Sequence, residues 1–181
     1  MINTLFPLDF YIQSKISNID EICDVADKLA EYRTQNNKWG NGCTVETVSM
    51  DKVDWHPLLE CAMSKFNEEI KWGNDIRVDC PWINFYERNS FQEIHHHKDC
   101  DFAAVIFLNS GKDFSKFFFK NRICGLIPPT MDRILNIGDA WYPEVASGDV
   151  VFFPAYTLHG VTPHNSNIIR KTLSFNIKLS Q

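Results

Sequence analysis

Apolar positions in the first part of the chain follow a strand pattern and then two helix patterns. Every second residue is apolar from Leu5 to Ile12, which predicts a half-buried strand, and a proline inside this run favours an edge position. The spacing then becomes helical and predicts a helix with Asn18 as its N-cap that continues to about Arg33. A turn at 38–43 precedes a second apolar stripe, which predicts a helix from Pro57 to Trp72.

From residue 80 to the end the pattern is that of short β-strands. Runs of aromatic and β-branched residues are separated by turn residues, and helices do not alternate with them, which favours a sandwich or closed barrel over an α/β fold. The longest irregular region, 121–147, is interpreted as part of a lid or substrate wall. The predicted strands are Trp82–Tyr86, Phe91–Lys98, Ala103–Leu108, Lys116–Phe119, Arg133–Asn136, Val150–Phe153, Thr157–Thr162 and Lys171–Leu179.

Composition narrows the class of protein. The length of 181 residues and the hydrophobic fraction of 44% fit one globular domain over 1–181. A formal net charge of −5 offers no basic field for a phosphate backbone, so nucleic acid is not an expected partner. The six cysteines are scattered without a CxxC pair, and no apolar run could span a membrane, so we expect reduced thiols in a cytoplasmic protein.

Four of the six histidines occur at 95, 96, 97 and 159. Side chains alternate along a strand, so His95 and His97 project from one face, and His159 ends an apolar strand that a jelly roll would bring nearby. Three protein ligands leave positions open for reactants, as in non-haem iron oxygenases, whereas a structural zinc site is closed by four. The alternative interpretation of such a short motif is a solvated polar strand and a core histidine.

Arg170 begins a line of polar residues at every second position of the last strand. A guanidinium with neighbouring hydroxyls suits bidentate capture of a carboxylate, so a dicarboxylate could bridge from a metal to this arginine. The alternative is an ordinary surface arginine beside a terminal strand. The polar residues that follow it are Thr172, Ser174 and Asn176.

Three segments carry a family resemblance: WINFYERNSFQEIHHH, GDVVFFPAYTLHGVTPH and RKTLSFNI. Together they resemble the iron(II) and 2-oxoglutarate-dependent dioxygenases, a superfamily that includes the prolyl 4-hydroxylases, and especially its small bacterial and phage members. The resemblance covers residues 80–178, whereas the N-terminal part matches only loosely. The positions that match are Trp82, Asn84, Tyr86, Gln92, His95, His97, Gly148, Asp149, Phe153, Pro154 and His159.

The resemblance implies a mainly β fold, a double-stranded β-helix of the jelly-roll or cupin-like type over 80–181, with an N-terminal strand and helices over 1–79 that support it. It implies the cofactor iron(II), the cosubstrate 2-oxoglutarate and O2. By this likeness the metal ligands and catalytic residues are His95, His97 and His159, and the cosubstrate residues are Arg170, Thr172, Tyr86 and Asn84.

The second proximal ligand departs from the superfamily pattern, which is His-x-Asp. Either this chain is a three-histidine variant, or the register is shifted and His97 and Asp99 form the pair. We favour His95 with His97 because Tyr86, Gln92 and the distance to the next strand fit that register.

The implied activity is hydroxylation of an unidentified peptidyl or small-molecule substrate, with 2-oxoglutarate converted to succinate and CO2. Two other functions remain open on the residues alone. A three-histidine cupin-type metalloenzyme without a cosubstrate would not need Arg170, and a jelly-roll binding module would need no catalysis. No segment is diagnostic of a substrate class or an oligomeric state.

Overall fold

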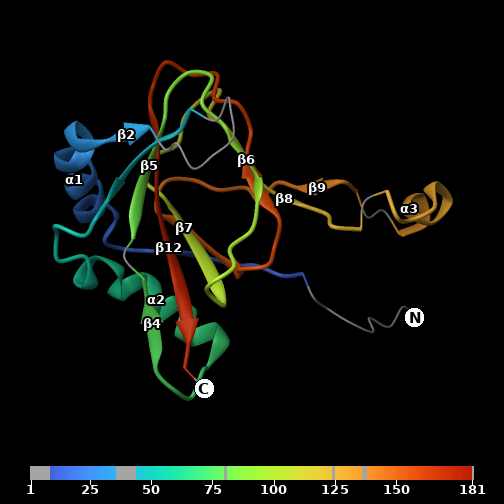
Figure 1. Cartoon of the computed structure of the whole chain (residues 1–181), viewed down its shortest axis with the longest axis horizontal. Coiled ribbons are helices and arrows are strands. Elements are labelled where there is room, and N and C mark those ends of the chain that lie inside the picture. The colour runs from blue at the N-terminus through green and yellow to red at the C-terminus, as the bar shows by residue number, and fades with distance from the viewer. Residues whose placement is uncertain (1–8, 36–43, 80, 124, 136–137, 181) are drawn as a thin grey trace.

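A computed structural model describes residues 9–35, 44–79, 81–123, 125–135 and 138–180. Over these residues two antiparallel sheets face each other (Figure 1). The large sheet has the order β1-β10-β7-β12-β5-β3-β2, with β4 paired to β12, and the small sheet has the order β6-β11-β8-β9. The strands are β1 (Ile12–Lys15), β2 (Thr34–Gln35), β3 (Glu46–Ser49), β4 (Ile76–Val78), β5 (Trp82–Tyr86), β6 (Gln92–His95), β7 (Phe102–Phe107), β8 (Phe117–Lys120), β9 (Ala140–Trp141), β10 (Asp149–Pro154), β11 (His159–Val161) and β12 (Arg170–Leu179).

The connections between the sheets define the fold. From β5 onward the chain passes to the small sheet with β6 and returns with β7, then repeats this passage through β8 and β9 to β10, and through β11 to β12. This winding between two facing sheets is the double-stranded β-helix, or jelly roll. The predicted fold class is therefore confirmed.

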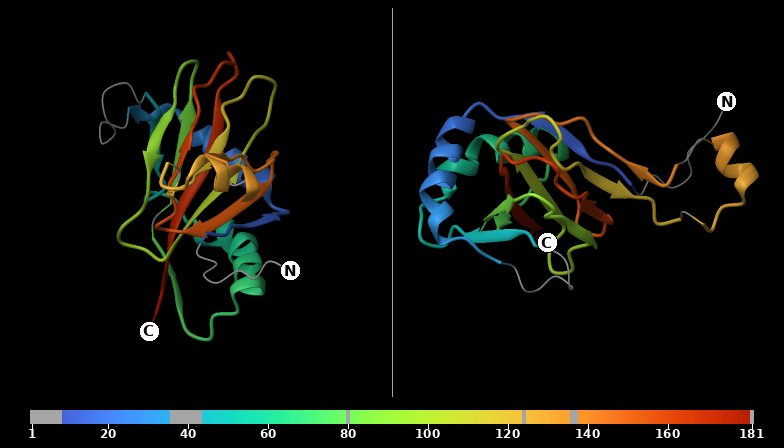
Figure 2. Two further views of the ribbon diagram at one scale, coloured as in Figure 1. Left: turned by 90° about the vertical axis from the view of Figure 1, so that its right-hand side faces the viewer. Right: turned by 90° about the horizontal axis from the view of Figure 1, so that it is seen from above.

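Two helices cover the face of the large sheet that points away from the small sheet (Figure 2). They are α1 (Ile19–Leu29), which continues as a 3-10 helix over Ala30–Tyr32, and α2 (His56–Ile70). Buried residues of both helices share one hydrophobic cluster with the strands, so the N-terminal part and the barrel have a common core. This supports the proposal that 1–181 form one domain. The cluster includes Ile22, Ala26, Leu59, Phe66, Ile83, Ile106, Phe152 and Phe175.

The central strands are buried on both faces, which explains their continuous apolar runs. In β10, Val150 and Phe152 belong to the cluster under the helices, whereas Val151 and Phe153 belong to a second cluster between the two sheets. In β12 the same alternation points Leu173, Phe175 and Ile177 toward the helices. Arg170, Thr172 and Ser174 of β12 consequently face the space between the sheets.

The N-terminal elements agree with the sequence in kind but differ in detail. Both predicted helices are present, yet the Asn18 side chain accepts no capping hydrogen bond and instead donates from Nδ2 to the Leu58 carbonyl of α2 at 2.9 Å. The first strand does lie at an edge of the large sheet, but it spans 12–15 because it pairs with β10 there. Residues 5–8 of the predicted strand and the turn at 38–43 lie outside the described residues.

One predicted strand is wrong, and several short ones were not foreseen. Residues 133–135 belong to a helix, α3 (Pro129–Leu135), on an arm that extends away from the barrel in Figure 1. Proline suits the first turn of a helix, and no described strand lies beside this segment to pair with it. The short strands β2, β3, β4 and β9 carry too few residues for a periodic signal. In the part of the chain that the structure describes, no helix is long and apolar enough to cross a membrane.

Candidate metal centre

Three histidines meet at one end of the space between the sheets. One ligand nitrogen from each of His95, His97 and His159 can be chosen so that all lie within 4.8 Å of one another. The ring centres of His95 and His159 are 4.1 Å apart, and those of His97 and His159 are 5.2 Å apart. Such a set of three converging imidazoles could hold one metal ion and leave further coordination positions open.

The pairing of β6 with β11 produces this cluster from segments more than sixty positions apart in the sequence. His95 ends β6 and lies directly opposite His159, the first residue of β11. Glycine follows His159 because β11 approaches its neighbours closely: a Cβ at Gly160 would lie 3.0 Å from the Gln92 carbonyl oxygen and 3.0 Å from the Phe118 ring.

His97 reaches the cluster from the loop after β6 and not from a continuing strand. The predicted strand to Lys98 therefore ends three residues early, at His95. The His97 main-chain N–H donates to the Ala155 carbonyl at 2.8 Å, which ties the loop to the end of β10. The ring of His97 lies 6.4 Å from that of Trp82, centre to centre, at a stacking angle of 25°.

Main-chain carbonyls set which nitrogen of two rings is available. Nδ1 of His95 lies 2.7 Å from the Glu93 oxygen, and Nδ1 of His159 lies 2.9 Å from the Thr157 oxygen. An imidazole that donates from Nδ1 to a carbonyl keeps the lone pair on Nε2, which is the usual arrangement of a metal-binding histidine. The local turns therefore prepare both rings as ligands.

Burial keeps all three rings neutral. Desolvation, with smaller contributions from the neighbouring His97 and His96, lowers the pKa of His95 to about 4, although the hydrogen bond to the Glu93 carbonyl opposes this shift. Burial also lowers the pKa of His97, and it lowers that of His159 well below the usual value, with His95 adding to the effect. A lower pKa means that the neutral form, which carries the lone pair that a metal needs, persists to lower pH.

Asp99 does not join the cluster. It is exposed, and the only group of three or more metal-ligating side chains that the described residues form is that of the three histidines. The structure thus brings together His95, His97 and His159, in agreement with the favoured register, and leaves Asp99 at the surface.

Arg170 lies in the same cavity as the histidines, which rules out a surface position. It is only 3% exposed, its Cζ lies 4.7 Å from the centre of the Tyr86 ring and 5.5 Å from that of Phe107, and burial lowers its pKa. Among the described residues no carboxylate pairs with it; Tyr86 is its side-chain hydrogen-bond partner, and its buried Nη1 has no hydrogen-bond acceptor. A buried guanidinium without a counter-ion is costly, so this site fits a carboxylate ligand.

The remaining predicted cosubstrate residues lie on the same wall. Asn84 Nδ2 donates to Thr172 Oγ1 at 3.2 Å and to Ser174 Oγ at 3.0 Å, whereas Tyr86 donates from its hydroxyl to Gln92 Oε1 at 2.9 Å. Asn84 thus orients two hydroxyls and does not itself line the cavity. The cavity is lined by Trp82, Tyr86, Gln92, His95, His97, Ala103, Ala104, Val105, Phe117, Phe153, His159, Val161, Arg170, Thr172 and Ser174.

Asn176 is a site residue that the sequence indicated only as part of a polar line. Its side chain interacts with the His97 ring and partly opposes the lowering of the His97 pKa. Asn176 Oδ1 itself is buried and has no hydrogen-bond partner among the described residues. The period-two pattern of β12 was the signal that could have identified it. Trp82 and Ser174 belong to the cavity for the same reason, since strands β5 and β12 turn alternate residues inward.

A separate apolar groove adjoins the metal cluster. Phe119 and Thr157 line this groove, and both contact His159. Phe119 is the β8 residue paired with His159, and the Thr157 carbonyl accepts a hydrogen bond from the His159 ring. Trp141, which is 61% exposed, forms an outer wall and donates from Nε1 to the Tyr11 hydroxyl at 3.2 Å. Residues from 121–147 thus form part of the wall of this groove, and their role toward a substrate stays a prediction. The other lining residues are Asp9, Phe10, Lys120, Asn121, Ile123, Gly138 and Ala140.

A jelly roll with a three-histidine cluster and a buried arginine in one cavity is the arrangement expected of a non-haem metal oxygenase. Comparison with protein families agrees: the family of 2OG-Fe(II) oxygenases matches residues 80–176. The chain belongs to this family, whose cofactors are iron(II), 2-oxoglutarate and O2. Comparison with curated proteins gave no significant match.

Solved structures share the fold at low sequence identity. The epimerase SnoN from nogalamycin biosynthesis, described as non-haem and α-ketoglutarate dependent, has a TM-score of 0.72 at 14% identity over 94% of this chain and 76% of its own. A Pseudomonas putida prolyl 4-hydroxylase has 0.68 at 14% identity over 93% and 92%. HygX from Streptomyces hygroscopicus, solved with nickel, 2-oxoglutarate and hygromycin B, has 0.67 at 9% identity over 94% and 83%.

Proposed function

We propose that this protein is a hydroxylase in which His95, His97 and His159 bind iron(II) and Arg170 binds the distal carboxylate of 2-oxoglutarate. The observation that carries the proposal is the buried guanidinium of Arg170, which has an unpartnered Nη1 and lines the same cavity as the three histidines. A metal-chelating dicarboxylate satisfies both ends of such a cavity. Solved structures of this fold include an epimerase and a carbocyclase. Hydroxylation of the substrate is therefore the part of the proposal that goes beyond membership of the oxygenase family.

The residues of this chain would position the cosubstrate and control its surroundings. Iron(II) at the histidines would supply the dioxygen chemistry in which 2-oxoglutarate is oxidised to succinate and CO2 and one oxygen atom goes to the substrate. Arg170 would pair with the carboxylate through two parallel N–H bonds, and the Thr172 hydroxyl would donate a third. Phe153, whose ring centre lies 4.6 Å from that of His159, would keep water from one side of the metal.

Binding of the cosubstrate can be tested without a known substrate. Purified protein loaded anaerobically with iron(II) and then titrated with 2-oxoglutarate is expected to develop the weak visible charge-transfer absorption of a chelated 2-oxo acid. The same protein titrated with succinate, which has no 2-oxo group to chelate, serves as the control. Metal-loaded protein that shows no such absorption would refute the cosubstrate assignment.

Two alternatives receive less support. A cupin-type metalloenzyme without a cosubstrate has no use for a buried arginine that no described carboxylate neutralises in the metal cavity. A binding module without catalysis has no need of three neutral histidines that converge within 4.8 Å. The family match also favours the oxygenase.

We further propose that the substrate occupies the apolar groove beside His159, with Trp141 as one wall. Truncation of an aromatic contact of this size costs about 1.5–3 kcal/mol, so Trp141→Ala should lower substrate-stimulated succinate release by about 10- to 100-fold at limiting substrate. Peptides and apolar small molecules would be screened on the wild-type protein first. Trp72→Ala is the matched control, because Trp72 is also partly exposed but lies at the end of α2.

This assignment fails if Trp141→Ala keeps full stimulation by every acceptor that works on the wild type.

Location in the cytoplasm stays a prediction, which the free thiols of Cys23, Cys61 and Cys100 support.

A further inference from the structure

We propose that Asn109, which does not line the cavity, is a positioning residue for the cosubstrate site. Its side-chain amide holds the main chain on both sides of Arg170 and thereby fixes where the guanidinium lies. This inference rests on the proposed function and deepens it, since it assigns the residue that preorganises the carboxylate anchor.

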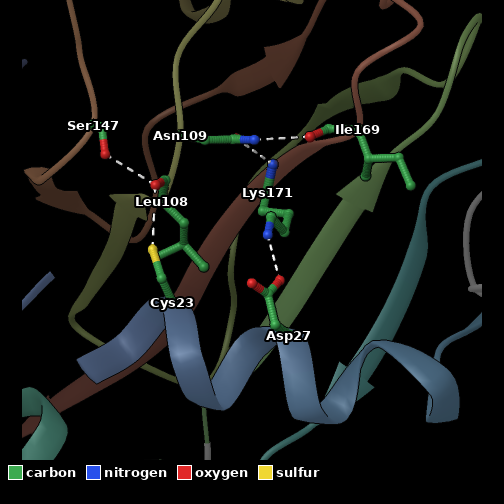
Figure 3. A network of polar contacts seen from close by, with 7 residues as sticks. All are labelled: Cys23, Asp27, Leu108, Asn109, Ser147, Ile169 and Lys171. Carbon is green, nitrogen blue, oxygen red and sulfur yellow. Dashed lines mark hydrogen bonds and ion pairs between the residues drawn. The ribbon is translucent and has the colours of Figure 1, made fainter. Parts of the chain in front are cut away.

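The side chain of Asn109 forms two hydrogen bonds to the residues that flank Arg170 (Figure 3). Its Nδ2 donates to the Ile169 carbonyl at 2.8 Å, and its Oδ1 accepts the main-chain N–H of Lys171 at 2.8 Å. One amide thus satisfies an acceptor before the arginine and a donor after it. Such a two-point attachment fixes the peptide units on both sides of Arg170.

The position of Asn109 in the sheet explains why a side chain does this work. The last regular pair between β7 and β12 is Phe107 with Thr172, and beyond it the Leu108 N–H still donates to the Lys171 carbonyl at 3.0 Å. At Asn109 the two strands separate, and the side-chain amide supplies the donor and acceptor that a continuing strand would have supplied from its main chain. Arg170 therefore has a fixed main chain at a strand end that would otherwise fray.

The segment that carries Asn109 is itself held from two directions. The Leu108 carbonyl accepts from Ser147 Oγ at 2.9 Å and from Cys23 Sγ of α1 at 3.4 Å, as Figure 3 shows. Helix α1 also holds the other strand, because Asp27 forms an ion pair with Lys171 Nζ. The helix and the asparagine thus brace the ends of β7 and β12 against each other.

Asn109 also sets the spacing of the rings around the guanidinium. Phe107, two residues before Asn109, packs against the Arg170 side chain from β7, while Tyr86 packs against it from β5. A bond between Asn109 and the Arg170 main chain therefore joins the strand of one ring to the strand of the arginine. A guanidinium held in this way needs less reorganisation when a carboxylate arrives, and this preorganisation increases affinity.

The test compares 2-oxoglutarate affinity in Asn109→Ala and wild-type protein by the anaerobic iron(II) titration. Loss of two hydrogen bonds that orient the anchor should weaken binding of 2-oxoglutarate by about tenfold, with iron(II) affinity unchanged. Asn18→Ala is the matched control, because Asn18 Nδ2 also donates to a main-chain carbonyl, that of Leu58, but away from Arg170. Asn18→Ala should lower the melting temperature, as Asn109→Ala does, but leave 2-oxoglutarate affinity at the wild-type value.

Asn109→Asp keeps the acceptor for the Lys171 N–H and loses the donor to the Ile169 carbonyl, so its 2-oxoglutarate affinity should lie between those of the wild type and Asn109→Ala. This variant replaces Asn109→Ala in the test if the alanine variant does not fold. The inference is wrong if both Asn109 variants bind 2-oxoglutarate within twofold of wild type, or if Asn18→Ala weakens binding equally. Arg170→Ala distinguishes failure of the proposed function from failure of the role of Asn109. If Arg170→Ala also leaves 2-oxoglutarate affinity unchanged, the cosubstrate assignment is wrong. If Arg170→Ala weakens binding and the Asn109 variants do not, only the role of Asn109 is wrong.

Discussion

Replacement of Arg170 by alanine is expected to weaken 2-oxoglutarate binding by at least about 30-fold, because truncating one partner of a buried charge pair costs about 2–5 kcal/mol. The arginine is almost completely buried, and no described residue supplies a carboxylate to it. The loss should therefore appear in the affinity for the dicarboxylate and not in the affinity for the metal. Anaerobic titrations with iron(II) and then with 2-oxoglutarate measure the two affinities separately.

Two further variants sharpen this result. Arg170→Lys keeps a positive charge but loses the planar pair of donors, so its affinity should lie between those of the wild type and Arg170→Ala. Arg88→Ala is the surface control, since Arg88 is exposed and donates only to Asn167 among described side chains. Turnover without 2-oxoglutarate that survives Arg170→Ala would instead indicate the cosubstrate-independent metalloenzyme.

Replacement of His97 by alanine is expected to lower iron(II) affinity by more than about 100-fold, because even the hydrogen-bond partners of metal ligands change affinity by about 10- to 100-fold. Asp99→Ala should leave iron(II) affinity near the wild-type value, since Asp99 is exposed and outside the cluster. Equilibrium dialysis of the purified variants against iron(II) under anaerobic conditions measures the difference.

His95→Ala decides between the two registers. In the favoured register it should lose iron(II) as His97→Ala does, because both rings lie against His159. Retention of iron by His95→Ala together with its loss in Asp99→Ala would establish the shifted pair. His96→Ala is the matched control, since His96 is exposed between the two candidate ligands and is absent from the cluster.

Periodicity was informative where a strand has a different environment on each face. The spacing of Arg170, Thr172 and Ser174 predicted a polar line, and in the structure these side chains line the cavity, while Leu173 and Phe175 are buried under the helices. The same rule predicted that His95 and His97 act together. It placed both on a strand, however, whereas His97 lies in a loop that a hydrogen bond to Ala155 holds in place.

Elements that depend on a distant partner were the ones that the sequence did not predict. The segment at 133–135 has apolar residues typical of a strand, but no described strand pairs with it, and it forms the helix α3. The first strand begins at Ile12 because its partner β10 is there. Asn109 gave no signal, since its hydrogen bonds cross to residues sixty and sixty-two positions away.

The sequence by itself determined the β character of 80–181, the two helices before it and the residue types of the site, because local spacing records which face of an element is buried. Only the tertiary structure decided that Asp99 stays outside, that Arg170 is buried without a counter-ion, and that Asn109 holds it. These facts depend on which strands pair and where they separate. Pairing joins residues far apart in the chain, and no local pattern specifies such contacts.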